Sequence, residues 1–156
     1  RAIGKSSAGK GGKLSPSQMR ELLRRSGLRA KKGLGQHFLT DRGVLAKIVK
    51  AAALTPDDLV IEVGPGLGIL TEELAKHAGK VIAVEVDGKM AVALSQRLGH
   101  FSTLTIINAN ILGLAPHELT GGEQAYKVVA NLPYYIAAAV LRHFLEEHGH
   151  KLVIWE

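Results

Sequence analysis

The feature that most constrains the fold is a glycine-rich turn that joins an apolar run to a helical pattern. Leu59 to Val63 is an apolar run broken only by Glu62, which is typical of a buried parallel strand. It leads directly into Gly64-Pro65-Gly66-Leu67-Gly68, where glycines let the backbone turn sharply and approach a ligand closely. Strand, glycine turn and helix in this order predict the first unit of a wound α/β sheet.

The rest of the chain alternates between strand and helix patterns. Asp41 is a plausible N-cap for a helix over 42–54, and a further helix is expected directly after the glycine turn. We expect further strands at 81–86, 103–107, 126–130 and 152–155, and helices at 67–78, 88–98 and 136–147. This alternation predicts a doubly wound, Rossmann-like α/β fold. Because the chain stops in the fifth strand at Glu156, we expect the fold to be truncated after that strand.

Charge divides the chain into two regions. Residues 1–32 hold ten Lys and Arg against one acid, Glu21, so this arm carries +9 and the remainder −3 of the net +6. We predict a basic N-terminal arm over 1–32, partly disordered with a short helix, followed by a catalytic domain over 33–156. Such an arm suits a polyphosphate partner, although a solvated tail or a transit peptide would have the same composition. The candidate RNA-binding residues are Arg24, Arg25, Arg29, Lys31 and Lys32.

Composition excludes several classes of protein. The chain has no cysteine, so it has no disulfide framework and no thiolate chemistry. No apolar run approaches the roughly 18 residues that span a bilayer. We therefore expect a cytoplasmic protein with no membrane contact, and we identify no metal site.

The spacing of the glycines indicates the cofactor. A dinucleotide fingerprint, G-x-G-x-x-G, would require glycine at position 69, where the chain has Ile69. The spacing here is G-x-G-x-G, with Glu62 two residues before it, which is the arrangement in S-adenosylmethionine enzymes. Gly64 and Gly66 would then surround the amino-acid part of the cofactor. A merely structural turn is the alternative.

Two polar residues at the ends of later strands extend this site. Glu85 ends the second strand, about 20 residues on, where a carboxylate can accept hydrogen bonds from both ribose hydroxyls. Asp87 competes with it for this role. Asn110 follows the third strand and could accept from the adenine amino group of the cofactor, or could form an ordinary Asx turn.

The segment Asn131-Leu132-Pro133-Tyr134 follows the fourth strand and should therefore face the cofactor. An adenine amine is a poor nucleophile, because its lone pair is delocalised into the ring. The Asn131 oxygen and the carbonyl of residue 132 or 133 could accept from the two amine hydrogens, with Pro133 shaping the turn. Tyr134 offers a face on which the target base can stack, for about 1–3 kcal/mol. A strand-ending turn with a core tyrosine is the alternative.

Together these motifs resemble the ribosomal RNA adenine N6-dimethyltransferase family. The resemblance covers about Lys31 to the end of the chain, and it is carried by Gly35-Gln36-His37-Phe38-Leu39, Glu62 to Gly68, Glu85-Val86-Asp87 and Asn131 to Ile136. Within the family the chain is more similar to the small-subunit enzyme than to the large-subunit antibiotic-resistance methylases. DNA adenine methyltransferases typically have Pro at the position of Leu132.

The resemblance implies an enzyme and a set of roles. It implies S-adenosylmethionine-dependent dimethylation of two adjacent adenosines in a hairpin loop near the 3′ end of small-subunit RNA, by a monomer acting in ribosome biogenesis. His37 and Leu39 would contact the methionine part of the cofactor, and Asn131 would lie between cofactor and target base. The family usually has Asp at the position of Asn110, so the amide loses a charge. Family chains also continue past Glu156 into a helical RNA-binding domain, so we expect this chain alone to bind cofactor weakly and to turn over poorly.

Three other functions are considered. The large-subunit antibiotic-resistance methylase is the second choice within the family. A methyltransferase-like module that binds RNA without turnover would share the basic arm but would not require Asn131 and Tyr134. An NAD-linked oxidoreductase is disfavoured by Ile69.

Overall fold

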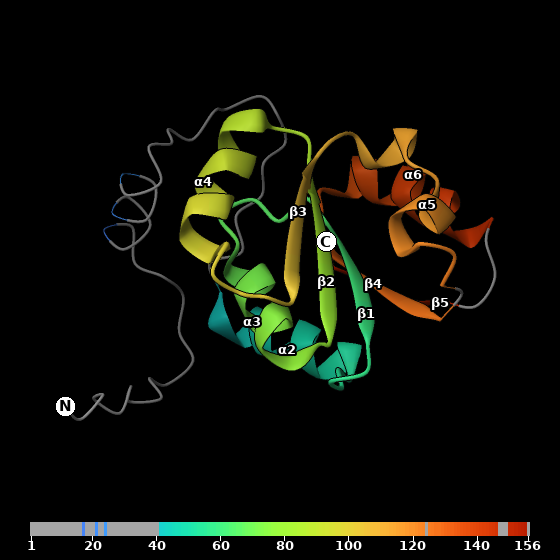
Figure 1. The fold of residues 1–156 in the computed structure, drawn as a ribbon, viewed down its shortest axis with the longest axis horizontal. Helices are drawn as coiled ribbons and strands as arrows, with labels where there is room; N and C mark the ends of the chain where they lie inside the picture. Colours follow the sequence, from blue (N-terminus) through green and yellow to red (C-terminus); the bar gives the residue numbers. More distant parts are fainter. Residues whose placement is uncertain are drawn as a thin grey trace.

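A computed structural model describes Ser17, Glu21, Arg24, and residues 41–123, 125–146 and 150–155. Its centre is a parallel five-stranded sheet in the order β3-β2-β1-β4-β5 (Figure 1). The strands are β1 (Leu59–Val63), β2 (Lys80–Glu85), β3 (Leu104–Asn108), β4 (Tyr126–Asn131) and β5 (His150–Trp155). This parallel sheet with intervening helices confirms the predicted Rossmann-like fold.

Helices cover both faces of the sheet. Figure 1 shows α2, α3 and α4 on one side and α5 and α6 on the other. Their bounds are α2 (Arg42–Ala52), α3 (Ile69–His77), α4 (Gly88–Leu98), α5 (Pro116–Thr120) and α6 (Tyr134–Leu145), with a short 3-10 helix, η1 (Ile111–Gly113), after β3. The sheet is therefore the middle layer of three.

Alternate residues of the strands supply two apolar cores. In β1, Ile61 and Val63 pack on the α6 side, with Val140 and Phe144, whereas Val60 packs on the α2 and α3 side. All five residues of β1 are buried, as the continuous apolar run predicts for a strand that is covered on both faces. Glu62 is the exception in polarity, since it is a carboxyl within this buried strand.

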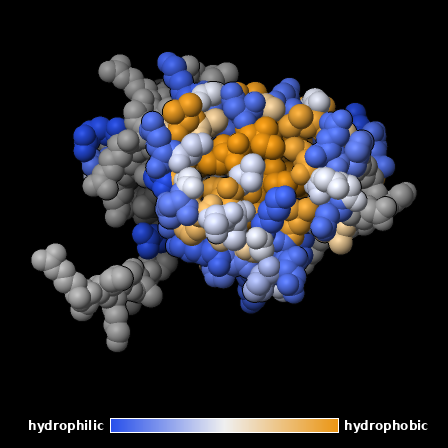
Figure 2. All heavy atoms as spheres, in the orientation of Figure 1, coloured by the Kyte–Doolittle hydropathy of each residue, from blue (hydrophilic) through white to orange (hydrophobic). Residues whose placement is uncertain are grey.

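β3 is an edge strand, and each of its residues is exposed or half-buried. Figure 2, in the same orientation as Figure 1, shows apolar residues gathered in the middle of the face that is turned to the viewer, over the β3 side of the sheet.

Among the described residues, no helix combines the length and apolar character that crossing a bilayer requires.

The predicted elements are present with shifted ends. The helix expected over 67–78 is Ile69–His77, because Gly68 is left-handed (φ 78°) and serves as its N-cap. The helix expected over 136–147 begins earlier, at Tyr134, because Pro133 occupies the N-cap and its carbonyl accepts the first helical hydrogen bonds, from Ile136 and Ala137. η1 and α5 were not predicted, since elements of three and five residues show no usable periodicity.

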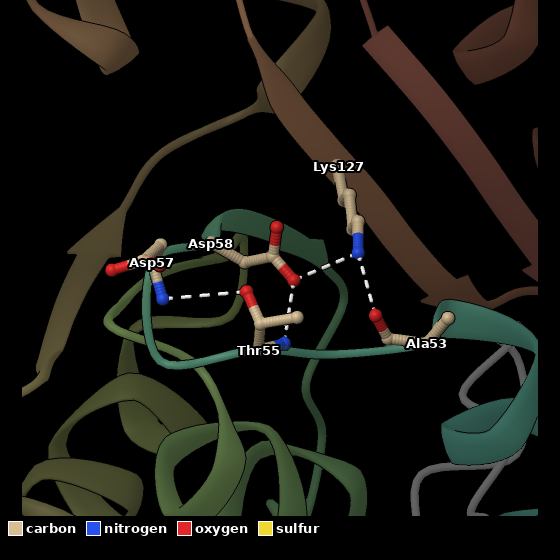
Figure 3. Close-up of polar contacts among 5 residues, drawn as sticks. All are labelled: Ala53, Thr55, Asp57, Asp58 and Lys127. Carbon is tan, nitrogen blue, oxygen red and sulfur yellow. Dashed lines mark hydrogen bonds and ion pairs between the residues drawn. The ribbon is translucent and has the colours of Figure 1, made fainter.

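A polar cluster ties the amino-terminal edge of the sheet to α2 (Figure 3). Lys127, the second residue of β4, donates from Nζ to Asp58 Oδ2 at 2.7 Å and to the Ala53 carbonyl at 2.8 Å. Ala53 is the left-handed C-cap of α2 (φ 47°), and the Thr55 N–H also donates to Asp58 Oδ2 at 2.7 Å. Burial acts to raise the pKa of Asp58, but the bonds from Lys127 and Thr55 outweigh it and lower that pKa below its ordinary value.

We expect Lys127→Met to lower the free energy of unfolding at neutral pH by about 2 kcal/mol, because it leaves a half-buried carboxylate and a helix-end carbonyl without their donor. The difference from wild type should shrink as the pH falls below about 3.9, since the lowered pKa of Asp58 stabilises the fold only while the carboxylate is charged. Urea denaturation measures both. Lys80→Met, at an exposed lysine on the same edge, is the control, and an equal loss in the two variants would contradict the role of the cluster.

Candidate functional site

The carboxyl ends of four strands meet at one edge of the sheet because their registers agree. Val63 pairs with Val84 in β2 and with Ala130 in β4, and Glu85 pairs with Asn108 in β3. The residues that follow these positions are therefore neighbours in space. They include the glycine loop, the acid of β2, the polar end of β3 and Asn131.

The glycine loop packs against the segment that follows β4. Gly64 has a φ of 66°, and a Cβ added to it would lie 3.2 Å from Leu132 Cδ2. The left-handed backbone and this close packing together favour glycine at the position. The loop expected to hold a cofactor and the segment expected to hold the target amine are thus in contact.

Glu85 faces the glycine loop from the end of β2. The residue is 4% exposed, and its Oε2 accepts from the Gly66 N–H and its Oε1 from the Asp87 N–H, both at 3.0 Å. Each oxygen retains a second lone pair, so the carboxylate can still accept from a pair of hydroxyls. Asp87, the alternative considered from the sequence, is instead the N-cap of α4 and accepts from the N–H groups of Lys89 and Met90.

The turn after β3 is organised by two asparagines. Asn110 Oδ1 accepts from the Leu112 N–H at 3.0 Å and caps η1, so the Asx-type turn considered from the sequence is present. Asn108, which is not among the residues predicted for the site, donates from Nδ2 to the carbonyls of Glu85 and Val86 at 2.8 and 3.2 Å. It holds the end of β3 against the end of β2, and the Asn-x-Asn spacing was the signal that could have revealed it.

The segment after β4 presents fewer free carbonyls than expected. The Pro133 carbonyl accepts from the N–H groups of Ile136 and Ala137, both at 3.1 Å, because it starts α6. Of the two backbone acceptors considered from the sequence, this leaves the Leu132 carbonyl. Asn131 is the last residue of β4 and is partly exposed, and no described residue hydrogen-bonds its side-chain amide. Tyr134 lies in the first turn of α6.

Glu62 is a buried acid beside this site. It is 1% exposed, and neither its Oε2 nor the Thr71 hydroxyl has a hydrogen-bond partner among the described residues. Burial raises the pKa of Glu62, the nearby Thr71 hydroxyl acts in the opposite direction, and the charge of Glu85 also raises it, so that the resulting pKa is about 8. Glu62 is therefore protonated at neutral pH. The sequence showed the acid before the glycines but not its burial.

The ends of β2 and β3 fit the ribose and the base of a nucleoside-type ligand. Beside the Glu85 carboxylate, at the ends of β2 and β3, Val86 is 71% exposed and Leu112 is 45% exposed. Large apolar side chains so exposed, next to a buried carboxylate with free lone pairs, can cover the faces of a planar base whose ribose the carboxylate holds. Among the described residues, no group of three or more His, Asp or Glu could hold a metal ion.

Several predicted residues lie outside the described part of the chain. These are His37, Leu39, Arg25, Arg29, Lys31 and Lys32. Arg24 is described: it is exposed and forms an ion pair with Glu21 at 2.8 Å.

Sequence comparison matches most of the chain to one family. A profile described as "Ribosomal RNA adenine dimethylase" matches residues 27–155. A protein of Dehalococcoides mccartyi named "Ribosomal RNA small subunit methyltransferase A" is 56% identical over 130 residues, which are 83% of this chain and 45% of the relative. A protein of Pediococcus pentosaceus with the same name is 44% identical over 135 residues, 84% of this chain and 46% of the relative. The chain thus spans about half the length of these relatives.

Two solved structures are similar to this chain. The 23S rRNA methyltransferase ErmE superimposes with a TM-score of 0.66 at 34% identity, over 73% of this chain and 45% of that protein. A dimethyladenosine transferase from Plasmodium falciparum superimposes with a TM-score of 0.64 at 25% identity, over 76% of this chain and 42% of that protein.

We expect Glu62→Gln to change how stability depends on pH. A carboxyl with a pKa near 8 in the folded state and near 4.5 when unfolded stabilises the fold fully below pH 4.5, and this contribution is lost as the pH rises to about 8. Glutamine does not titrate, so between these pH values the variant should gain on wild type by on the order of a few kcal/mol. Urea denaturation at both pH values measures this. If the exposed Glu118→Gln shows the same trend, Glu62 is not the group responsible.

Proposed function

Because the chain belongs to the ribosomal RNA adenine dimethylase family, we propose that the protein transfers methyl groups from S-adenosylmethionine to the N6 amines of adenosines in small-subunit ribosomal RNA. More specifically, we propose that the targets are two adjacent adenosines in a hairpin loop near the 3′ end of that RNA, and that each is dimethylated. The observation that carries the proposal is the contact between Leu132, next to the amide of Asn131, and Gly64 of the glycine loop.

The cofactor would be held by the ends of the first three strands. Glu85 would accept from the ribose hydroxyls with its remaining lone pairs, while it keeps the Gly66 N–H in place. Gly64 and Gly66 would surround the amino-acid part, together with His37 and Leu39. Asn110 would reach the cofactor adenine with the amide nitrogen and the lone pair that its Asx cap leaves unused. When bound, the cofactor supplies an electrophilic methyl group on a sulfonium.

The chemistry needs acceptors aimed at the target amine. Asn131 Oδ1 and the Leu132 carbonyl would accept from the two amine hydrogens, which turns the nitrogen lone pair toward the methyl group. The Pro133 carbonyl serves the start of α6 instead, so the role of Pro133 is to direct the chain from β4 into the helix. We propose that Tyr134 stacks on the target base, which must be unpaired or flipped to enter. Positioning would supply most of the acceleration.

The partner would be ribosomal RNA in the small subunit. The basic arm, including Arg24, would add affinity by releasing counterions from the RNA backbone. We propose that residues 33–156 form the catalytic unit and that the protein acts as a monomer in the cytoplasm.

A methylation assay tests the function. The protein at its natural length is incubated with S-adenosylmethionine and unmethylated small or large ribosomal subunits, and the modified base is mapped. The proposal expects N6-dimethyladenosine at adjacent positions in small-subunit RNA. Methylation of large-subunit RNA would instead support the alternative function, a large-subunit methylase of the antibiotic-resistance type. The similarity to the 23S rRNA methyltransferase ErmE is the observation that favours this alternative. RNA binding without methylation of either subunit would indicate a module without turnover.

We expect Asn131→Ala to lower kcat by about 10²–10³-fold, because it removes one preorganised acceptor from the amine. The dissociation constant for S-adenosylmethionine should change little, since the proposed cofactor contacts lie mainly on the first three strands. Single-turnover assays and calorimetry separate the two quantities, with the exposed Glu118→Gln as control. Equal losses of binding and rate would show that Asn131 is only a cofactor ligand.

A further inference from the structure

The backbone of the glycine loop is held by residues of β2 and α4 as well as by a hydrogen bond within the loop. The Gly68 N–H donates to the Pro65 carbonyl within the loop at 2.9 Å, and the Gly64 N–H donates to the Val84 carbonyl of β2 at 3.0 Å. Two side chains from outside also hold its backbone. Glu85 accepts from the Gly66 N–H, and Arg97, in the last turn of α4, donates from Nη2 to the Leu67 carbonyl.

α4 packs directly on the loop where Arg97 reaches it. A Cβ on Gly68 would lie 2.7 Å from Arg97 Nη2 and 2.9 Å from Leu98 Cδ1, and it would also meet Leu94. There is therefore no room for a side chain between the loop and α4. A shift of this helix face must be transmitted to the backbone of the loop, because closely packed groups cannot move independently.

The guanidinium suits this place. Arg97 is only partly exposed, and burial lowers its pKa, while the carboxylate of Glu72 in the first turn of α3 acts to raise it. Arginine remains charged at neutral pH in such surroundings, so its bond to the Leu67 carbonyl is charge-assisted. The β2–α4 unit thus contributes one side-chain bond to the loop from each end of α4: from Glu85 before the helix and from Arg97 in its last turn.

We propose that Arg97 is a positioning residue for the cofactor: it sets the backbone of Leu67 and Gly68 from behind, and so shapes the part of the loop that receives the amino-acid chain of S-adenosylmethionine. This inference rests on the proposed function for the identity of the ligand. The ribose and base would be held elsewhere, by Glu85 and the ends of β2 and β3.

The test compares ligands that differ in the amino-acid chain. Wild type, Arg97→Met, Arg97→Lys and the control Lys89→Met, at an exposed lysine in the first turn of α4, are prepared in the protein at its natural length. Calorimetry gives dissociation constants for S-adenosylmethionine and for 5′-methylthioadenosine, which lacks that chain. Hydrogen exchange of the amides of residues 66–69 is measured without ligand.

We expect Arg97→Met to weaken S-adenosylmethionine binding about tenfold, the effect of losing one charge-assisted hydrogen bond, and to leave 5′-methylthioadenosine binding unchanged. Its loop amides should exchange faster before any ligand is added. Arg97→Lys should recover part of both effects, because it restores a cationic donor, and Lys89→Met should match wild type.

Other results would overturn the inference. Unchanged binding and exchange in Arg97→Met would show that the bond does not hold the loop. Equal weakening of both ligands would show general damage to the fold. If Arg97→Met does not fold, Arg97→Lys carries the same comparison, and wild-type behaviour in that variant for both ligands and for exchange would contradict a need for the guanidinium. Failure of wild type to bind S-adenosylmethionine would refute the proposed function, whereas the exchange comparison would still decide whether Arg97 holds the loop.

Discussion

The parallel register of β1 with its two neighbours is the constraint on which the site depends. Val63 lies opposite Val84 on one side and Ala130 on the other, so both adjacent strands end level with the glycine loop. The residues that follow these positions therefore lie close together at one edge of the sheet. A slip of one residue in either pairing would also turn alternate side chains to the opposite face of the sheet, which buried apolar residues on both faces strongly disfavour.

Backbone atoms of the glycine loop form much of the site. The residues that hold this backbone in place therefore lie on other elements, far from the loop in the sequence. The loop offers N–H and carbonyl groups whose directions depend on what holds them from behind. Glu85 orients the Gly66 N–H, Arg97 engages the Leu67 carbonyl, and Leu132 packs against Gly64. These three residues come from β2, α4 and the end of β4. The loop is thus shaped by elements that follow it in the chain, and the charge of Glu85 in turn disfavours ionisation of the buried Glu62.

Much of the fold could be predicted because it is written in local patterns. Strands β1 to β5 and the longer helices follow from apolar periodicity and, for α2, from the cap residue Asp41. Their ends were less predictable, since α3 begins only after the left-handed Gly68 and α6 begins at Tyr134, directly after Pro133. The short elements η1 and α5 contain too few residues for a periodic signal.

The sequence by itself determined which residue types stand at the strand ends: the glycines of the loop, the acid Glu85, Asn110 and the Asn131 segment. It could do so because these positions are set by short spacings along the chain. Local caps and turns then use some of their groups: Asp87 caps α4, Asn110 Oδ1 accepts in an Asx turn, and the Pro133 carbonyl starts α6. Only tertiary structure buried Glu62 and brought Arg97 to the loop, because burial and contact depend on where distant segments meet in space, which no local pattern records.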